Sequence, residues 1–310
     1  MSTLFVTHPA CLDHQPPLGH PERPDRLRAI DRVLEGEQFQ MLARERAPAA
    51  AEIDTIALCH PVDYIEAIQD ATPKEGLVRL DADTSMSPGS FEAALRATGS
   101  AILAVDSVMK GEAHNAFCAI RPPGHHAETA VPMGFCFFNT AAIGARYAQK
   151  RHGVDRVAIV DFDVHHGNGT QQIFWSDPTV MYCSTHQMPL FPGTGAVSER
   201  GEHDNIVNAP LRPGDAGDKF REAVETRILP RLRGFKPDLV IVSAGFDAHV
   251  RDPLANLNLV EEDFAWATRK IMDIADASAQ GRVVSVLEGG YDLEGLARSA
   301  AAHVTALMRG

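Results

Sequence analysis

Short apolar runs alternate with longer amphipathic segments along this chain. The apolar runs are rich in Val and Ile, which is typical of buried strands. Between them, apolar residues recur three or four positions apart, as Leu27, Ile30 and Leu34 do, and this spacing predicts helices. The predicted strands cover residues 4–6, 116–120, 156–160, 179–183, 238–242 and 282–287. The predicted helices cover residues 24–34, 61–70, 90–110 with Ser90 as N-cap, 139–151 and 216–231, then a helix carrying Phe264, Ile271 and Ile274, and a closing helix from about 292.

This alternation predicts a single α/β domain over residues 1–310, with a central parallel sheet and helices on both faces. No repeat, low-complexity tract or linker divides the chain. The polar segment 185–204 is predicted to be a long loop, and loops of that length are uncommon unless they are functional or well packed.

Polar motifs follow five of the predicted strands. They are RPPGHH at 121–126, DFDVHHGN at 161–168, STH at 184–186, Asp247 within SAGFDAH, and EGGY at 288–291. Each motif alone has an ordinary structural explanation, such as a helix cap, a turn or a core histidine. Because ligands of open α/β sheets bind outside the carboxyl ends of the strands, the five together predict one site.

Three of these polar side chains form a candidate metal site. Asp163 and His165 are two residues apart on a chain that has just left a strand, so they project to the same side. Asp247 follows another predicted strand. One imidazole nitrogen and two carboxylates suit zinc, and a catalytic zinc needs three protein ligands and one open position. We therefore expect one zinc ion per chain.

The paired histidines His125 and His126 are candidate acid–base groups. Asp161 is placed to accept a hydrogen bond from one of them, and Asn168 from the other. A carboxylate partner raises a histidine pKa more than an amide does, so the two rings are expected to differ in protonation state. Such a difference suits a base and an electrostatic stabiliser.

Tyr291, on a glycine-rich turn, is a candidate donor to the oxyanion of a tetrahedral intermediate. Together with the metal site and the histidines, it predicts metal-assisted hydrolysis of an amide or ester.

Composition narrows the setting. The chain has 310 residues, of which 45% are hydrophobic and 23% charged, as in an ordinary globular protein. The sequence has no apolar run of membrane-spanning length and no signal-peptide pattern, so a cytoplasmic location without a membrane partner is expected. The five scattered cysteines indicate reduced thiols. A formal net charge of −12 disfavours direct binding of nucleic acid.

The motifs RPPGHHA, GFCFFN, DFDVHHGNGTQ, FPGTG, SAGFDAH and LEGGYD, in that order, resemble those of the histone deacetylase superfamily. GHPERPDRL at 19–27 is similar to class II members and to bacterial histone deacetylase-like amidohydrolases. The resemblance runs from about residue 8 to the end of the chain. It implies the arginase/deacetylase fold with an eight-stranded parallel sheet. It also implies zinc-dependent removal of acetyl or other acyl groups from acyl-lysine in proteins or peptides.

The resemblance also implies residue roles. Asp163, His165 and Asp247 match the zinc ligands, His126 the general base and acid, His125 with Asp161 the electrostatic pair, and Tyr291 the oxyanion donor. Asn168 stands where class I enzymes have Asp and resembles class II enzymes. A structural potassium ion beside the zinc is implied, held by Asp161, Asp163 and Ser184 with backbone carbonyls of His165 and Thr185.

Other matching residues concern the substrate. Phe135 and Phe191 match the pair that walls the acyl-lysine tunnel, with Gly134 contributing backbone, and Arg26 matches a buried arginine near the acetate-release cavity. Polyamine-selective relatives have a rim segment that resembles residues 251–254 of this chain but has Glu at its last position. Leu254 stands there in this chain and favours acetyl-lysine in peptides or proteins, although Asp83 or Asp252 could supply the charge instead.

Alternative functions leave different residues in the motifs. An acetylpolyamine amidohydrolase stays open, because it keeps the whole catalytic set and acts on a small amide. A binuclear manganese ureohydrolase would need carboxylates where Gly167 and His249 stand. A non-catalytic acyl-lysine binding module would have lost a ligand, a histidine or the tyrosine, and class IIa members have His in place of Tyr291. The sequence leaves assembly into a homo-oligomer open.

Overall fold

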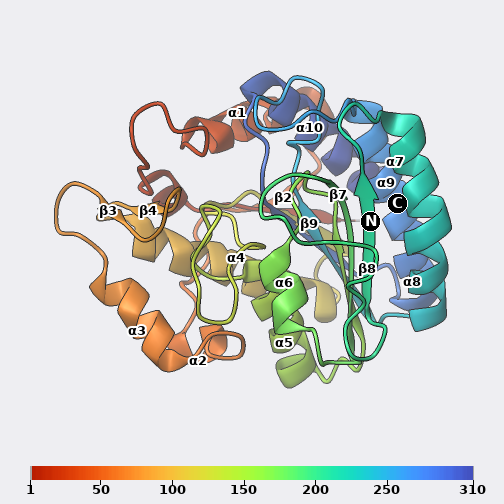
Figure 1. Ribbon diagram of the computed structural model, residues 1–310, viewed down its shortest axis with the longest axis horizontal. Helices are drawn as coiled ribbons and strands as arrows, with labels where there is room; N and C mark the ends of the chain where they lie inside the picture. The colour runs from red at the N-terminus through yellow and green to blue at the C-terminus, as the bar shows by residue number, and fades with distance from the viewer. Residues whose placement is uncertain (1, 310) are drawn as a thin grey trace.

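Eight strands form one sheet in the computed structural model, which describes residues 2–309 (Figure 1). The strand order is β2-β1-β5-β10-β9-β6-β7-β8, and all neighbours are parallel. The strands are β1 (Thr3–Val6), β2 (Ala43–Glu45), β5 (Asn115–Cys118), β6 (Val157–Asp161), β7 (Val180–Gln187), β8 (Ile206–Leu211), β9 (Leu239–Ala244) and β10 (Val283–Leu287). A separate antiparallel pair consists of β3 (Val78–Arg79) and β4 (Ser85–Met86). The predicted α/β fold with a parallel sheet is confirmed.

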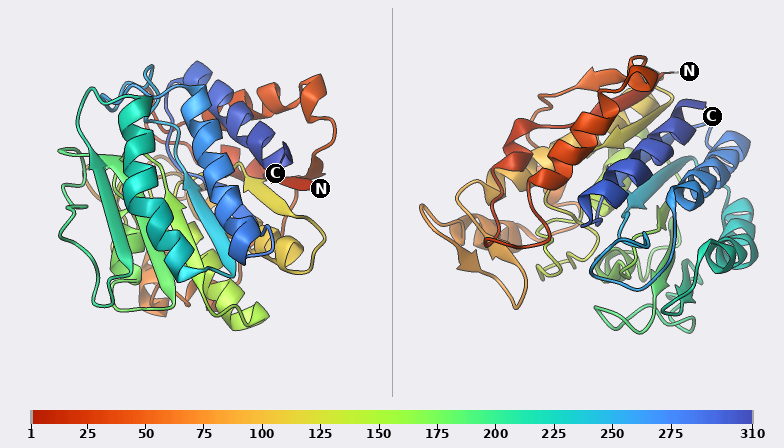
Figure 2. Two further views of the ribbon diagram at one scale, coloured as in Figure 1. Left: turned by 90° about the vertical axis from the view of Figure 1, so that its right-hand side faces the viewer. Right: turned by 90° about the horizontal axis from the view of Figure 1, so that it is seen from above.

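Helices cover both faces of the sheet (Figure 2). On one face α1, α10, α9 and the α7–α8 pair lie side by side, and on the other α4 packs against α5. The helices are α1 (Asp25–Leu34), α2 (Ile53–Ile56), α3 (Val62–Asp70), α4 (Ser90–Met109), α5 (Thr140–His152), α6 (Asn168–Ile173), α7 (Gly217–Ala223), α8 (Leu229–Phe235), α9 (Glu261–Ser278) and α10 (Leu293–Arg309).

The central strands are mostly apolar because both faces of the sheet are covered. Val157–Asp161 is buried at every residue, and so is Leu239–Ala244. Burying a Val, Leu or Ile side chain contributes about 1.5–3 kcal/mol, so these strands anchor the fold. This rigid centre carries the residues that follow its carboxyl ends.

Several strand boundaries differ from the predictions. Ser184 to His186 was expected to follow a strand but lies inside β7, which runs to Gln187, so the loop predicted over 185–204 covers 188–205 instead. The edge strands β2 and β8 were not predicted. β2 has only three residues, and β8 contains Asn208 and Pro210, which weaken its strand pattern.

Two helix predictions also need correction. Ser90 is the first helical residue and Gly89 is the N-cap; the Ser90 hydroxyl accepts the N–H of Ser87 at 2.7 Å. The helix predicted over 216–231 is divided by a π-helical turn at Val224–Ile228. Pro230 follows directly and has no N–H for an α-helical bond, which is a local reason for the altered turn. The short helices α2 and α6 were not predicted.

Within residues 2–309, no helix is both long enough and apolar enough to cross a membrane.

His303 is a fully buried histidine on α10 with partners on two other elements. Its Nδ1 lies 2.6 Å from the Thr268 hydroxyl on α9, and its Nε2 lies 2.9 Å from the Ser285 hydroxyl on β10. Burial lowers the pKa of His303 to about 3. The ring is therefore neutral in the folded protein at pH values where it binds a proton in the unfolded chain.

We expect this burial to make the protein less stable in acid. Below pH 6.5 the unfolded chain gains a proton at this position that the folded protein does not bind until about pH 3, so stability falls as pH falls through this window. One such site contributes a slope of up to about 1.4 kcal/mol per pH unit. We expect the free energy of unfolding, measured in urea between pH 7 and 5, to depend less steeply on pH in His303→Gln than in wild type. His203→Gln, at an exposed position, is the control; equal slopes in the His303 variant and wild type would contradict the expectation.

Candidate metal centre and active site

Asp163, His165 and Asp247 converge at the carboxyl ends of β6 and β9, and one ligand atom from each lies within 4.8 Å of the others. Nδ1 of His165 is 3.2 Å from Oδ1 of Asp163 and 3.0 Å from Oδ2 of Asp247. All three side chains are buried. Burial, followed by the facing charge of Asp163, raises the pKa of Asp247 to about 7. A cation between the two carboxylates would relieve this repulsion, so the three residues fit a metal ion, and one nitrogen with two oxygens suits zinc.

Backbone N–H groups hold the outer oxygens of this triad. Gly289 N donates to Oδ2 of Asp163 at 2.7 Å, and Val164 N donates to Oδ1 of Asp247 at 2.9 Å. The remaining oxygens face His165. A side chain at Gly289 would overlap the carboxylate of Asp247. The turn after β10 therefore orients the triad, as groups that hydrogen-bond to metal ligands do in metal sites.

His125 and His126 lie side by side with their ring centroids 4.0 Å apart. Nδ1 of His125 is 2.9 Å from Oδ2 of Asp161, and Nδ1 of His126 is 2.9 Å from Oδ1 of Asn168. The Asn168 amide donates from Nδ2 to Glu128 at 2.8 Å, which leaves Oδ1 as acceptor for His126. The proton of a neutral His126 therefore sits on Nδ1, and its Nε2 is free to accept another.

The charges around the two rings act in opposite directions. Burial disfavours a charge on His125, but Asp161, Asp163 and Glu288 outweigh it and raise the pKa of His125 well above its usual value. Burial and the positive charge of His125 lower the pKa of His126 well below its usual value. The arrangement favours a charged His125 beside a neutral His126.

Asp161 is also held by neighbouring strands. The Tyr182 hydroxyl donates to Oδ2 of Asp161 at 3.0 Å, and Oδ1 accepts the N–H of Asp163 at 3.1 Å. Ser184 lies opposite Asp161 in the β6–β7 register. The N–H of Gln187 donates to the Val164 carbonyl at 2.8 Å, which brings the chain around 163–165 alongside the end of β7. The residues predicted to hold potassium thus lie on adjacent segments.

Tyr291 is held by contacts with its backbone and ring. Its N–H donates to Asp252 at 2.7 Å, and Arg26 donates from Nε to the Gly290 carbonyl at 2.6 Å. The Arg26 guanidinium lies 4.9 Å from the centroid of the Tyr291 ring. Burial and the nearby charge of Asp247 raise the pKa of Tyr291 well above its usual value, so its hydroxyl keeps its proton. Arg26, predicted near an inner cavity, is fully buried and contacts the tyrosine turn directly.

The predicted tunnel residues lie beside the catalytic candidates. The Phe135 ring packs edge-on against Tyr291 with centroids 6.0 Å apart, and the Phe191 ring packs against His126 at 5.0 Å. Phe191 is 39% exposed, so it reaches the surface. Gly134 has a φ of +57° and its backbone passes over His126.

The predicted rim residues differ in how free their polar atoms are. Asp252 is buried; its Oδ1 accepts the N–H of Leu254 at 3.0 Å and its Oδ2 that of Tyr291. Asp83 accepts the Thr84 hydroxyl at 3.1 Å, and burial together with Asp81 raises the pKa of Asp83. Both oxygens of Asp252 are therefore occupied by backbone N–H groups, one in its own loop and one in the tyrosine turn, whereas Asp83 lies beside a second carboxylate, Asp81.

Sequence reasoning assigned no role to several buried residues around the site. Glu22 binds the guanidinium groups of Arg26 and Arg121, and all three side chains are fully buried. Glu288 accepts backbone N–H groups of the histidine loop. Glu22 and Arg121 stand beside prolines within quoted motifs, and charged residues next to Pro in such motifs are a usable signal for these contacts.

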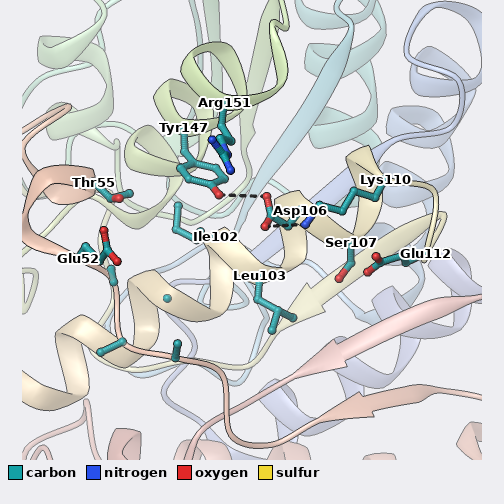
Figure 3. A pocket seen from close by; sticks show the side chains of 14 residues that line it. Glu52, Thr55, Ile102, Leu103, Asp106, Ser107, Lys110, Glu112, Tyr147 and Arg151 are labelled. Carbon is teal, nitrogen blue, oxygen red and sulfur yellow. Dashed lines mark hydrogen bonds and ion pairs between the residues drawn. The ribbon is translucent and has the colours of Figure 1, made fainter.

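A hollow of about 710 Å³ lies elsewhere, between α4, α5 and residues 49–52 (Figure 3). None of the predicted site residues lines it. Its Asp106 carboxylate already accepts the Tyr147 hydroxyl at 3.1 Å and Lys110 at 3.0 Å. These residues lie near the ends of α4 and α5 that lead into β5 and β6. They are therefore at the amino ends of the strands, whereas the candidate site is at the carboxyl ends.

The close passage of Gly134 over His126 gives a stability prediction. In Gly134→Ala the new methyl group would overlap the His126 imidazole, and the left-handed backbone adds about 1–2 kcal/mol. Gly153→Ala is the matched control, because its φ of +66° is similar but open space surrounds it. Denaturant unfolding should show a larger loss of stability in Gly134→Ala; equal losses would mean that His126 is not closely covered.

Comparisons with known proteins agree with this geometry. The histone deacetylase domain pattern matches residues 20–307. The chain is 40% identical to the histone deacetylase-like amidohydrolase of Pseudomonas aeruginosa, over 89% of this chain and 74% of that one. It is 38% identical to a probable deacetylase of Archaeoglobus fulgidus, over 95% and 83% of the two chains. The crystal structure of the HDA15 HD domain superposes with a TM-score of 0.94 at 33% identity, covering 99% of this chain and 88% of that one. The resemblance seen in the motifs is confirmed, and the chain belongs to the histone deacetylase family.

Proposed function

We propose that this protein is a zinc-dependent amidohydrolase that removes acetyl or other acyl groups from Nε-acyl-lysine in proteins or peptides. Membership in the deacetylase family supports a hydrolase that acts on an acyl amide. The observation that carries the proposal is the convergence of the buried metal-ligand triad with the histidine pair.

Oδ1 of Asp163, Nδ1 of His165 and Oδ2 of Asp247 would hold the zinc. Zinc bound there would acidify a water molecule and polarise the acyl carbonyl. We assign a structural potassium ion to Asp161, Asp163 and Ser184 with the carbonyls of His165 and Thr185.

His126 is the base and acid of the proposed reaction. Its Nδ1–H is engaged by Asn168, so Nε2 takes the proton of the attacking water and later gives it to the departing lysine nitrogen. The lowered pKa of His126 keeps the ring neutral before the reaction, which is the state a base needs.

His125 and Tyr291 stabilise the developing charge. The ion pair with Asp161 keeps His125 positively charged next to the reacting atoms. The Tyr291 hydroxyl donates a hydrogen bond to the oxyanion, and such a donor is typically worth on the order of 10²–10³ in kcat. Its raised pKa keeps the hydroxyl protonated over the working range.

The rim supports acyl-lysine over acylpolyamine. Phe135 and Phe191 suit a slender alkyl stem, and Leu254 offers an apolar wall. Asp252 has both oxygens occupied by backbone N–H groups and is a poor partner for a second ammonium. An acetylpolyamine amidohydrolase is the second candidate, because Asp83 remains as a carboxylate at the predicted rim.

We also propose a cytoplasmic location. All five cysteines are free and buried, which fits a reducing compartment.

Metal analysis tests the zinc assignment. We expect one zinc ion per active chain, loss of hydrolysis on chelation, and recovery when zinc is returned. Asp247→Ala removes one of three ligands and should lower both metal content and turnover. Asp106→Ala, in the hollow near the amino ends of the strands, should keep both metal content and turnover. Activity that requires two divalent metal ions per chain, or persists without zinc, would contradict the proposal.

A substrate panel tests the choice of acyl-lysine. Wild-type kcat/KM should be higher for an acetyl-lysine peptide than for acetylspermidine, because Leu254 cannot attract an ammonium group. Leu254→Glu should raise relative activity on acetylspermidine, since a carboxylate meets the extra cation. Leu254→Gln matches the size of Glu without its charge and should not. Wild-type preference for acetylspermidine over every acetyl-lysine peptide would favour the second candidate.

A further inference from the structure

Glu288 is a buried carboxylate directly after β10 to which the proposed reaction assigns no step, although its charge is among those that raise the pKa of His125. It is 1% exposed and stands three residues before Tyr291. The following inference rests on the proposed function, because it concerns how the reacting groups are placed.

The Glu288 side chain contacts the histidine loop and not the substrate tunnel. Its Oε2 accepts the N–H of Gly124 at 2.7 Å and that of His125 at 3.1 Å. Its Oε1 accepts the Ser243 hydroxyl at 3.1 Å, at the end of the neighbouring strand β9. This one carboxylate therefore links the start of the histidine loop to β10 and β9. β10 leads into the tyrosine turn, and β9 leads to Asp247, the third proposed metal ligand.

A second link runs beside the first. Arg26 donates to the carbonyls of Glu288 and Gly290, at 2.5 and 2.6 Å, and so holds the tyrosine turn. Glu22 accepts from Arg26 at 3.0 Å and from Arg121, on the histidine loop, at 2.6 Å. The two loops are thus tied through Glu288 directly and through Arg26–Glu22–Arg121 indirectly.

We infer that Glu288 is a positioning residue that sets the spacing between the histidine pair and Tyr291. His126 and Tyr291 act on opposite ends of one reacting amide, so their separation has to match the transition state. When a mutation far from the chemistry displaces the reacting groups by about 1 Å, the rate can fall on the order of 10²-fold.

The contact needs an acceptor of the right reach and does not need a negative charge. In Glu288→Gln, the amide oxygen can accept both N–H groups, and the amide nitrogen can donate to the Ser243 oxygen, which reverses only the hydrogen bond to Ser243. Glu288→Asp keeps the charge but is one methylene shorter. Glu288→Ala leaves two buried N–H groups unpaired.

The experiment compares these variants in the zinc-loaded enzyme with an acetyl-lysine peptide. We expect kcat to fall on the order of 10²-fold in Glu288→Ala, less in Glu288→Asp, and only a few-fold in Glu288→Gln, with much smaller changes in KM and no loss of zinc. Asp238→Ala is the matched control: this carboxylate accepts the N–H of Arg156 at 2.9 Å just before β9, at the opposite edge of the sheet. It should lose stability without losing kcat.

Some outcomes would overturn the inference. Near wild-type kcat in Glu288→Ala would do so, and if that variant does not fold, wild-type kcat in Glu288→Asp would do so instead. A Glu288→Gln enzyme as slow as Glu288→Asp or slower would assign the role to the charge.

Amide exchange separates this inference from the proposed function. If wild type does not cleave acyl-lysine, the proposed function fails. Exchange at Gly124 and His125 still tests the contact: it should be fast in Glu288→Ala or Glu288→Asp and slow in wild type and Glu288→Gln. Equal exchange in all of these proteins would overturn the inference.

Discussion

Buried charge has to be compensated inside the protein, and this constraint organises the carboxyl edge of the sheet. A carboxylate removed from water is costly unless it is paired and hydrogen-bonded. Asp161 is paired with His125, and Glu22 with two arginines. Asp163 and Asp247 both contact His165, and each accepts a backbone N–H: Asp163 from Gly289 after β10, and Asp247 from Val164 after β6. The loops after β5, β6 and β10 are therefore each held by an acidic side chain of another loop.

The same constraint explains how the loops of the site are held together without regular secondary structure. The segments after β5, β6 and β10 have N–H groups outside regular secondary structure, and buried N–H groups need acceptors. Asp247, Asp252 and Glu288 supply them across loops. The proposed metal ligation, charge compensation and loop shape thus depend on the same few carboxylates, so replacing one of them affects more than one property.

Sequence patterns predicted most of the fold because buried parallel strands read as apolar runs. The patterns failed at β2 and β8, where an edge position permits short or polar strands. They placed Asp163, His165 and Asp247 together because the carboxyl ends of parallel strands meet. The contact of Glu288 with Gly124 joins residues far apart along the chain through a backbone N–H group. Because nearly every residue type has a backbone N–H, the sequence does not show which one acts as a donor. The roles of the zinc, potassium and tunnel residues remain predictions.

The position of β10 in the sheet has a consequence for how the protein matures. β10 comes near the end of the chain, yet it lies between β5 and β9 in the middle of the sheet. While a ribosome still holds the last part of the chain, β5 and β9 have no strand between them, and neither Gly289 nor Tyr291 is in place. Pairings between distant segments form slowly because loop closure precedes any gain from contact. Asp163, His165 and Asp247 all precede β10 in the chain, whereas the Gly289 N–H that holds Asp163 follows it. The candidate site therefore reaches its full geometry only when β10 has entered the sheet.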